Sequence, residues 1–260
     1  MCGRFSLGAT IRIGQLFDLP NWPETPPRYN IAPSQEVPAV IQNRETGARE
    51  FRPFRWGLVR SWAKDPAVGN RMINARSETA ATTPAFRKPL RERRCLILAD
   101  GFYEWKREGS RKQPYYIKLR GGEPFAFAGL WDRWQPPEGE PLDTCTILTT
   151  TPNAVLQPIH DRMPVILAPS AYSVWLDPAM RDVEPVQALL TPYPADAMIT
   201  YPVSTRVNKP AYDAPECIAR WLDSPPLEAF WNVLKRREVL WKTEVLEEIR
   251  QLREKAVKAR

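Results

Sequence analysis

Twenty-eight prolines distributed over 260 residues limit the fold of this chain more than any other feature. Proline fixes φ and removes a backbone N–H, so it favours short elements over long ones. Short apolar runs rich in β-branched and aromatic residues lie between the prolines, and such runs are typical of strands. The predicted strands are residues 37–42, 51–56, 95–99, 115–119, 124–130, 144–150 and 163–168.

Three short helices have recognisable start signals. Thr83-Pro84, Thr151-Pro152 and Ser170 each combine a capping hydroxyl with a proline or a following helix former. The helices predicted after the second and third signals are 153–159 and 171–176. We therefore expect an α+β fold in which mainly antiparallel sheets form a barrel-like core with short peripheral helices.

Ser224-Pro225-Pro226 marks a domain boundary, because two prolines suit the start of a helix and not its interior. We predict one domain over residues 1–223 and an extension over residues 224–260. From Leu227 the extension has the apolar spacing of one long amphipathic C-terminal helix. We expect this helix to pack on the core, and the alternative is a basic arm or a coiled-coil surface for a protein partner.

Charge and composition exclude several classes of protein. The formal net charge is +7, but residues 235–260 supply more than half of it, so DNA affinity would have to come from locally clustered arginines. No apolar run approaches the roughly 18 residues of a membrane span, so we expect a soluble, cytoplasmic protein. Four widely separated cysteines and a single histidine give neither a disulfide framework nor a metal site, and no cofactor is expected.

Cys2 follows the initiator methionine directly. Removal of Met1 would leave a 1,2-aminothiol, whose amine titrates at about 7.7 to 8.0 and whose thiol titrates near 8.5 in model compounds. An aldehyde can form an imine with such an amine and can then close to a five-membered thiazolidine ring with the thiol. Taken alone, a cysteine at this position is more often an incidental or buried thiol.

Three further segments carry candidate chemistry. Asn74 to Thr79 brings together an amide, a guanidinium and hydroxyls, although a strand end followed by a helix capping box fits it equally well. On a strand, Phe102 and Glu104 would share one face, and Glu104 is either a salt-bridged structural acid or a proton-transfer group. His160 is the only imidazole for acid–base chemistry near neutral pH, and the simpler interpretation is a structural histidine.

Six motifs along the chain resemble those of the SRAP family, the SOS response-associated peptidases or abasic-site processing proteins, and they occur in the same order as in the family. The resemblance covers roughly residues 1 to 222. The motifs are Met1-Cys2-Gly3-Arg4-Phe5, Tyr29-Asn30-Ile31-Ala32-Pro33, Phe54-Arg55-Trp56-Gly57-Leu58, Asn74-Ala75-Arg76-Ser77-Glu78-Thr79, Gly101-Phe102-Tyr103-Glu104-Trp105 and Ile159-His160-Asp161-Arg162-Met163-Pro164.

The resemblance implies a sensor of abasic sites in single-stranded DNA that forms a covalent thiazolidine crosslink through Cys2 after loss of Met1. This mechanism requires Cys2 to be the exposed start of the mature chain, with its nitrogen and sulfur directed into a cleft. It implies that Asn74 orients the Cys2 amine, that Glu104 acts as acid and base, and that His160 is a second proton-transfer group. A lyase step and peptidase activity are further family properties. The DNA contacts that it implies are Arg4, Arg76 and Thr149 to phosphates, and Pro33, Trp62, Phe86 and Trp105 to bases or cleft walls.

Two other functions remain open from the residues. One is a thiol peptidase in which Cys2 attacks an amide with His160 or its own amine as the base, acting at least on Met1 itself. The other is a non-catalytic DNA-binding or scaffold protein that works through the C-terminal helix.

Overall fold

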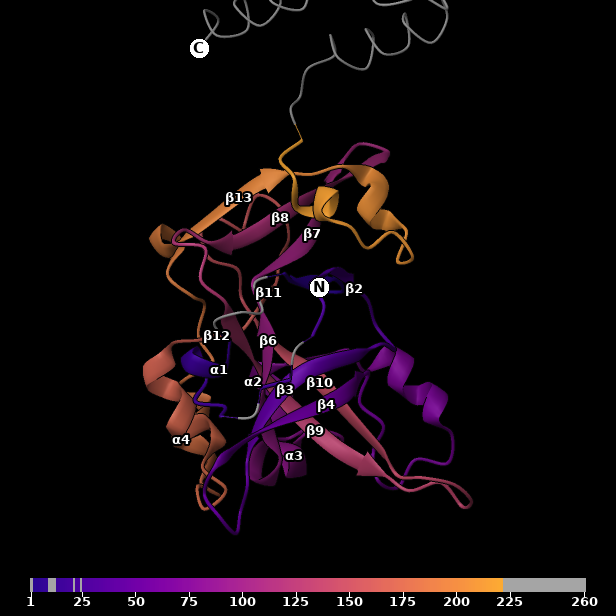
Figure 1. The fold of residues 1–260 in the computed structure, drawn as a ribbon, viewed down its shortest axis with the longest axis vertical. Helices are drawn as coiled ribbons and strands as arrows, with labels where there is room; N and C mark the ends of the chain where they lie inside the picture. The colour runs from indigo at the N-terminus through magenta and orange to yellow at the C-terminus, as the bar shows by residue number, and fades with distance from the viewer. Residues whose placement is uncertain (1, 9–12, 21, 24, 222–260) are drawn as a thin grey trace, which may run out of the picture. The chain divides into compact units, whose positions relative to one another are not determined.

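A computed structural model of the protein describes residues 2–8, 13–20, 22–23 and 25–221 (Figure 1). The chain divides into two compact units, Met1–Arg220 and Trp221–Arg260. The long helix predicted from Leu227, and the hypotheses that depend on it, lie outside the described residues. Within those residues, no helix has both the length and the apolar character that a membrane crossing requires.

One sheet of the first unit has five strands, and all neighbouring strands in it are antiparallel. Its strands, in spatial order, are β13 (Met198–Pro202), β8 (Arg111–Leu119), β7 (Gly101–Glu108), β1 (Phe5–Leu7) and β2 (Arg28–Ile31). The strands β7, β8 and β13 lie together at the upper end of Figure 1.

The second sheet closes on itself and forms the predicted barrel. Its strands are β11 (Met163–Pro164), β10 (Leu142–Thr150), β4 (Arg49–Trp56), β3 (Glu36–Gln42), β6 (Arg94–Ala99), β9 (Phe125–Trp134) and β12 (Ile166–Leu167), with β5 (Asn74–Arg76) beside β10. Because β9 also pairs with β10, the strands β10, β4, β3, β6 and β9 form a closed ring. Pairing is antiparallel except where β10 runs parallel to β4 and to β5.

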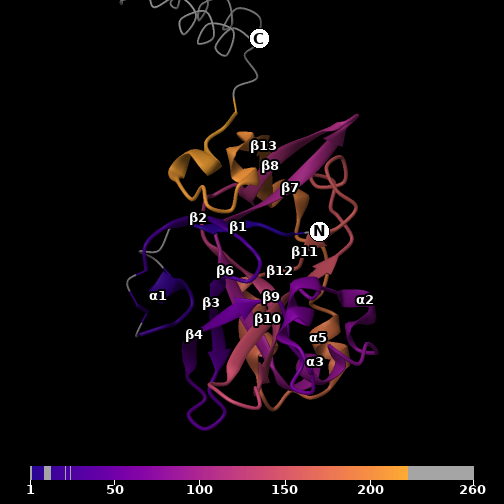
Figure 2. The same ribbon diagram turned by 90° about the vertical axis from the view of Figure 1, so that its right-hand side faces the viewer.

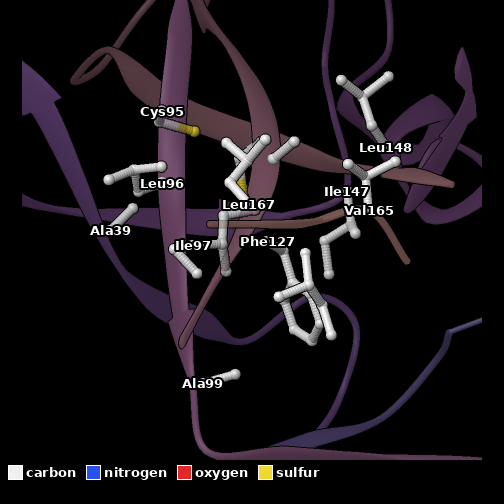
Figure 3. Close-up of a cluster of buried hydrophobic side chains, with 14 of the residues drawn as sticks. Ala39, Cys95, Leu96, Ile97, Ala99, Phe127, Ile147, Leu148, Val165 and Leu167 are labelled. Carbon is white, nitrogen blue, oxygen red and sulfur yellow. The ribbon is translucent and has the colours of Figure 1, made fainter. Parts of the chain in front are cut away.

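The barrel interior is filled by aliphatic and aromatic side chains (Figure 3). Every residue of β6 is buried, which explains why residues 95–99, after Arg94, form a continuous apolar run and do not alternate. Phe127 packs edge-on against both Phe5 and Phe102, so the barrel core continues into the five-stranded sheet. Each such ring contributes about 1.5 to 3 kcal/mol through burial.

Short helices surround the barrel. They are α1 (Ile13–Leu16), α2 (Ser77–Ala80), α3 (Arg87–Glu92), α4 (Tyr172–Leu176) and α5 (Val183–Gln187), with 3₁₀ turns η1 (Pro66–Arg71), η2 (Pro169–Ala171), η3 (Ala195–Ala197), η4 (Thr205–Asn208) and η5 (Pro215–Ile218). Figure 2 shows α3 and α5 on one side of the barrel. Phe17, the residue after α1, stacks on Tyr172 of α4 with the ring centroids 5.4 Å apart.

The predicted α+β class and six of the seven predicted strands are confirmed, while residues 163–168 form two separate strands, β11 and β12, that pair with β10 and β9. The helix predicted over residues 171–176 is confirmed as α4, whereas the other two helix predictions need correction. The helix expected over residues 153–159 is wrong, because the segment forms turns. The Asn153 side chain accepts the backbone N–H groups of Val155 and Leu156, as a helix N-cap does. The backbone bonds that follow mix three- and four-residue spacings, since the N–H groups of Leu156 and Gln157 both donate to the Asn153 carbonyl, and no regular helix forms. The helix expected after Thr83-Pro84 begins only at Arg87, and the predicted capping box at Ser77 makes no side-chain cap.

Asp100 is the point where the chain leaves the barrel and enters the five-stranded sheet. It follows β6 and precedes β7, and its carboxylate accepts hydrogen bonds from the Ser6 hydroxyl and the Gly8 N–H, both at 2.6 Å. These bonds hold β1 beside β7. Gly101 is required there, since a Cβ at this position would lie 2.1 Å from the Tyr116 hydroxyl. The junction thereby fixes where the start of the chain lies.

Candidate functional site

The pairing of β1 with β7 carries the N-terminal segment to Glu104. Phe5 is opposite Phe102, and the Tyr103 N–H donates to the Arg4 carbonyl at 3.0 Å. In an antiparallel pair the residues before Phe5 run along the residues after Phe102. Cys2 therefore lies near Glu104, close enough that the Glu104 charge raises the pKa of the Cys2 thiol in addition to the larger effect of burial.

Asn74 reaches Cys2 from the barrel. It is positioned by β5, which pairs with β10 so that Asn74 is opposite Ile147. The Asn74 Nδ2 donates to the Cys2 carbonyl at 2.7 Å and so fixes the backbone of the candidate nucleophile. The Asn74 Oδ1 is buried and has no hydrogen-bond partner among the described residues. An unpaired buried acceptor costs about 1 to 3 kcal/mol and calls for a functional explanation.

Cys2 differs from the expectation of a thiol exposed in a cleft. The chain described here carries Met1, and in it Cys2 is 0 % exposed and belongs to the main hydrophobic core. Burial, as the largest cause, raises the pKa of the thiol far above its ordinary value. Exposure of Cys2 is thus contradicted for the chain that retains Met1, since its side chain is packed as an apolar group.

Glu104 is the buried acid of the site. It lies on β7, and the predicted alternation is confirmed because Phe102 joins the main core while Tyr103 and Trp105 belong to a second cluster. Glu104 is 2 % exposed, and this burial raises its pKa to about 7 against the opposing charge of the chain's amino terminus. A carboxyl group that titrates near neutral pH can both donate and accept a proton.

His160 completes the group. It lies in the loop between β10 and β11, with its Nε2 4.0 Å from the Glu104 Oε2. Its Nδ1 lies 3.0 Å from the Arg162 backbone N–H, a proton donor, and 2.8 Å from the Asp161 Oδ1, a proton acceptor. Burial lowers the pKa of His160, with Asp161 acting in the opposite direction. Both protonation states of Nδ1 therefore have a partner, which suits a group that exchanges protons.

A pocket of about 640 Å³ opens over this group. It is lined by Glu104, Trp105, Arg107, Lys112, Ile159, His160, Asp161 and Asn208. Two of the four predicted catalytic residues, Glu104 and His160, thus line the pocket, while Cys2 and Asn74 are not among its lining residues. The structure therefore brings all four predicted residues to one place from four distant parts of the chain.

The three predicted phosphate contacts differ in accessibility. Arg4 is half-buried, and its Nη1 donates to the Asn30 Oδ1 at 2.7 Å and to the Val207 carbonyl at 2.8 Å. Thr149 is fully buried, with its hydroxyl donating to the Ala75 carbonyl. Arg76 is exposed. Of these three residues, only Arg76 has an exposed side chain. The side chains of Arg4 and Thr149 form hydrogen bonds within the protein.

The predicted stacking residues also divide into two kinds. Trp62 is 52 % exposed and carries the Arg60 guanidinium over its ring, whereas Phe86 is packed into the core at 9 % exposure. Trp105 is partly buried, and its Nε1 donates to the Asn208 Oδ1 at 2.8 Å. Pro33 is partly exposed at the turn after β2. Trp62 is therefore the ring most available to a base.

Sequence reasoning missed residues that brace the site. Arg162 pairs bidentately with Glu78 at 2.7 and 2.8 Å and also donates to the Thr149 carbonyl at 2.6 Å. It thereby ties the His160 loop to α2 and β10. The only sequence signal for the role of Arg162 is that it lies in the same short motif as His160. Among the described residues, no group of three or more His, Cys, Asp or Glu side chains is arranged to hold a metal ion.

The chain is similar to a known protein family and to several named proteins. The family model described as SOS response associated peptidase (SRAP) matches residues 1–210. The abasic site processing protein YoqW of Bacillus subtilis is 47% identical over 84% of this chain and 99% of its own length. The abasic site processing protein HMCES of Gallus gallus is 36% identical over 74% of this chain and 66% of its own length.

A solved structure has the same fold. The crystal structure of a protein from Bacteroides thetaiotaomicron is 27% identical, with a TM-score of 0.75 over 85% of this chain and 100% of that one. The match of the family model over most of the chain, together with the 47% identity to YoqW, shows that this chain belongs to the SOS response associated peptidase (SRAP) family.

Proposed function

We propose that this protein recognises abasic sites in single-stranded DNA and, once Met1 is removed, traps them covalently as a thiazolidine on Cys2. The observation that carries this proposal is the placement of Glu104, whose pKa is about 7, beside Cys2 and 4.0 Å from His160. The relatives YoqW and HMCES are named as abasic site processing proteins, which supports the same substrate.

The first chemical step is imine formation. An abasic deoxyribose opens to an aldehyde when a proton reaches the ring oxygen and another leaves the C1′ hydroxyl. Protonated Glu104 supplies the first proton, and the carboxylate that this leaves takes up the proton of the C1′ hydroxyl. In its ionised form Glu104 also accepts a proton from the Cys2 ammonium, which frees the amine. The amine adds to the C1′ carbonyl, and loss of one water gives the imine. A pKa of about 7 makes both forms of Glu104 abundant at neutral pH.

The second step closes the ring. The Cys2 sulfur bonds to the imine carbon, and the thiol proton passes to the imine nitrogen. The product is a thiazolidine, so the overall reaction joins protein and DNA with loss of one water. The Asn74 amide holds the Cys2 carbonyl at 2.7 Å, which fixes the direction in which the nitrogen and the sulfur point. His160, 4.0 Å from Glu104, is a second group through which the proton can return.

Recognition of an abasic site rests on what surrounds the missing base. With no base to read, affinity comes from phosphate contacts and from stacking of neighbouring bases. Arg76 and the exposed Trp62 are of these two kinds. Single strands are the natural target, because a duplex would have to be opened first.

The alternative of a general thiol peptidase has less support. A thiol nucleophile acts as its thiolate, and a reactive cysteine therefore has a lowered pKa. Burial and the nearby Glu104 both raise the pKa of the Cys2 thiol. The same burial weakens the narrower alternative that Cys2 removes Met1 itself, because it is found in the chain that carries Met1. Intact-mass measurement of Cys2→Ser beside wild type, in cells with and without methionine aminopeptidase, tests this alternative.

A crosslinking experiment tests the main proposal. Wild-type protein of confirmed N-terminal mass is incubated with an oligonucleotide containing one abasic site, and the mixture is run on a denaturing gel. We expect a slowly migrating species whose mass equals protein plus DNA minus one water. Cys2→Ala should abolish it, while the matched variant Cys217→Ala, at another buried cysteine, should retain it. An adduct that persists in Cys2→Ala refutes the proposal.

A further inference from the structure

The hairpin of β7 and β8 forms one wall of the pocket beyond Glu104. The register of β1 with β7 ends at Phe102, and the Tyr103 N–H donates to the Arg4 carbonyl, so β7 extends beyond its ladder with β1. Three residues of β7 line the pocket, namely Glu104, Trp105 and Arg107. Lys112 joins them from β8. The wall therefore extends outward from the acid of the site.

The charged side chains on the two faces of this hairpin differ in whether they form ion pairs. On one face, Lys106 forms an ion pair with Glu108 at 3.1 Å, and Glu108 is directly opposite Arg111. On the face shared with Trp105, Arg107 is directly opposite Lys112, and neither forms an ion pair with any other residue that the structure describes. Like charges opposite each other destabilise a strand pair. We call the face that carries Trp105, Arg107 and Lys112 the pocket face. Its two positive charges are not neutralised by an ion pair with any residue that the structure describes.

An aromatic platform lies next to these charges. Trp105 precedes Arg107 by two residues and so shares its face of β7. The Trp105 Nε1 donates to the Asn208 Oδ1 at 2.8 Å, which fixes the plane of the indole. Asn208 belongs to η4, the same turn whose Val207 carbonyl accepts from Arg4. A fixed indole beside two cations combines a surface for a planar base with a site for an anion.

We propose that Arg107 and Lys112 form a phosphate-binding pair that, with Trp105, holds the nucleotide next to the abasic sugar on one side of the strand. This inference rests on the proposed DNA-trapping function and extends it to a defined subsite. Arg107 lies three positions beyond Glu104 along β7, or about 10 Å at 3.3 Å per residue. That distance places the pair within reach of the first phosphate beyond a sugar that is bound at Glu104.

Paired charge-neutralising variants test the subsite. Arg107→Gln/Lys112→Gln removes the two positive charges of the pocket face. Lys106→Gln/Arg111→Gln removes two from the other face of the same hairpin and is the matched control. All four residues are outside the core, so unchanged thermal unfolding should confirm that both variants fold. Binding is measured by fluorescence anisotropy with a single strand that contains tetrahydrofuran, a stable abasic analogue, at several salt concentrations.

We expect the pocket-face variant to bind about tenfold more weakly than wild type. The slope of log affinity against log salt should fall by about 0.7 for one lost phosphate contact on a single strand. The control variant should keep the wild-type slope to within half that change. Equal effects in the two variants would indicate a general electrostatic field and would overturn the inference.

Oligonucleotides with one arm locate the contact. One probe carries nucleotides only on the 5′ side of the analogue, and the other carries them only on the 3′ side. The pocket-face variant should lose affinity for one probe and not for the other, whereas loss for both or for neither overturns the inference. The crosslinking gel with wild type separates the two proposals. If wild type forms no adduct, the trapping function fails. If it forms an adduct and Arg107→Gln/Lys112→Gln binds normally, only the subsite fails.

Discussion

Replacing Glu104 by Gln tests whether this carboxyl group titrates near neutral pH. Burial raises its pKa from about 4.5 to about 7, and the side chain is 2 % exposed, so solvent screening is slight. Each pKa unit corresponds to about 1.4 kcal/mol, which makes ionised Glu104 destabilising by about 3 kcal/mol relative to its ionisation in the unfolded chain. Gln has nearly the same shape and cannot ionise.

The sign of the effect follows from which state binds the proton. Between pH 4.5 and 7 the folded protein keeps the Glu104 proton while the unfolded chain has lost it. The free energy of unfolding of wild type therefore falls through this range because of Glu104, and Glu104→Gln does not have this loss. The variant should gain about 3 kcal/mol over wild type between pH 4 and pH 8, with a constant difference outside that range.

Urea unfolding at a series of pH values measures this difference, with the N-terminal mass of both proteins checked first. The same variant should trap DNA about 10²-fold more slowly, and its rate should lack the wild-type inflection near pH 7. A stability difference that does not change with pH would show that Glu104 has an ordinary pKa. In that case the assignment of Glu104 as both acid and base is refuted.

Other perturbations test the neighbouring groups. Asn74→Ala removes the hydrogen bond to the Cys2 carbonyl and should slow trapping by about tenfold to a hundredfold, as measured by adduct formation at saturating DNA. Asn74→Asp, which keeps an acceptor and loses the donor, should be equally slow. His160→Gln should still form the adduct, but the adduct should release its DNA more slowly, as measured by exchange onto a competing abasic oligonucleotide. An unchanged release rate would exclude His160 from the reversal. Trp62→Ala should weaken DNA binding by about 1 to 3 kcal/mol without lowering thermal stability, because Trp62 is 52 % exposed. A fall in the melting temperature would instead make Trp62 a packing residue.

The strands could be predicted from the sequence because the apolar pattern of each one lies within a few consecutive residues. The apolar run of residues 95–99 reflects burial on both faces of β6, and it appears in the sequence without knowledge of the partners. The period of two along β7 likewise predicts that Phe102 and Tyr103 lie on opposite faces, and they belong to two different clusters. Helices were read less well. Asn153 follows a proline and was interpreted as a helix start, but its side chain caps a turn, and its Nδ2 bonds to the Tyr193 carbonyl from a distant segment. No local pattern contains that partner.

The burial of functional side chains was equally inaccessible to the sequence. Thr149 was predicted to contact phosphate, yet its hydroxyl lies against the Ala75 carbonyl because β5 and β10 run parallel at that register. The exposure expected for Cys2 also failed in the chain that retains Met1. Arg107 and Lys112 were overlooked because only the register of the hairpin shows that they are opposite each other. Pairing between strands decides each of these cases.

The candidate site depends on a junction between two sheets. The five-stranded sheet supplies Cys2 through β1 and Glu104 through β7, while the barrel supplies Asn74 through β5. The only hydrogen bond of Asn74 to Cys2 therefore crosses from one sheet to the other. A shift of β1 by one residue would turn its side chains to the opposite face and would move Cys2 away from Glu104. The hydrogen bonds from Ser6 and Gly8 to Asp100 oppose that shift, and so the position of Cys2 beside Glu104 depends on a buried aspartate at the junction of the two sheets.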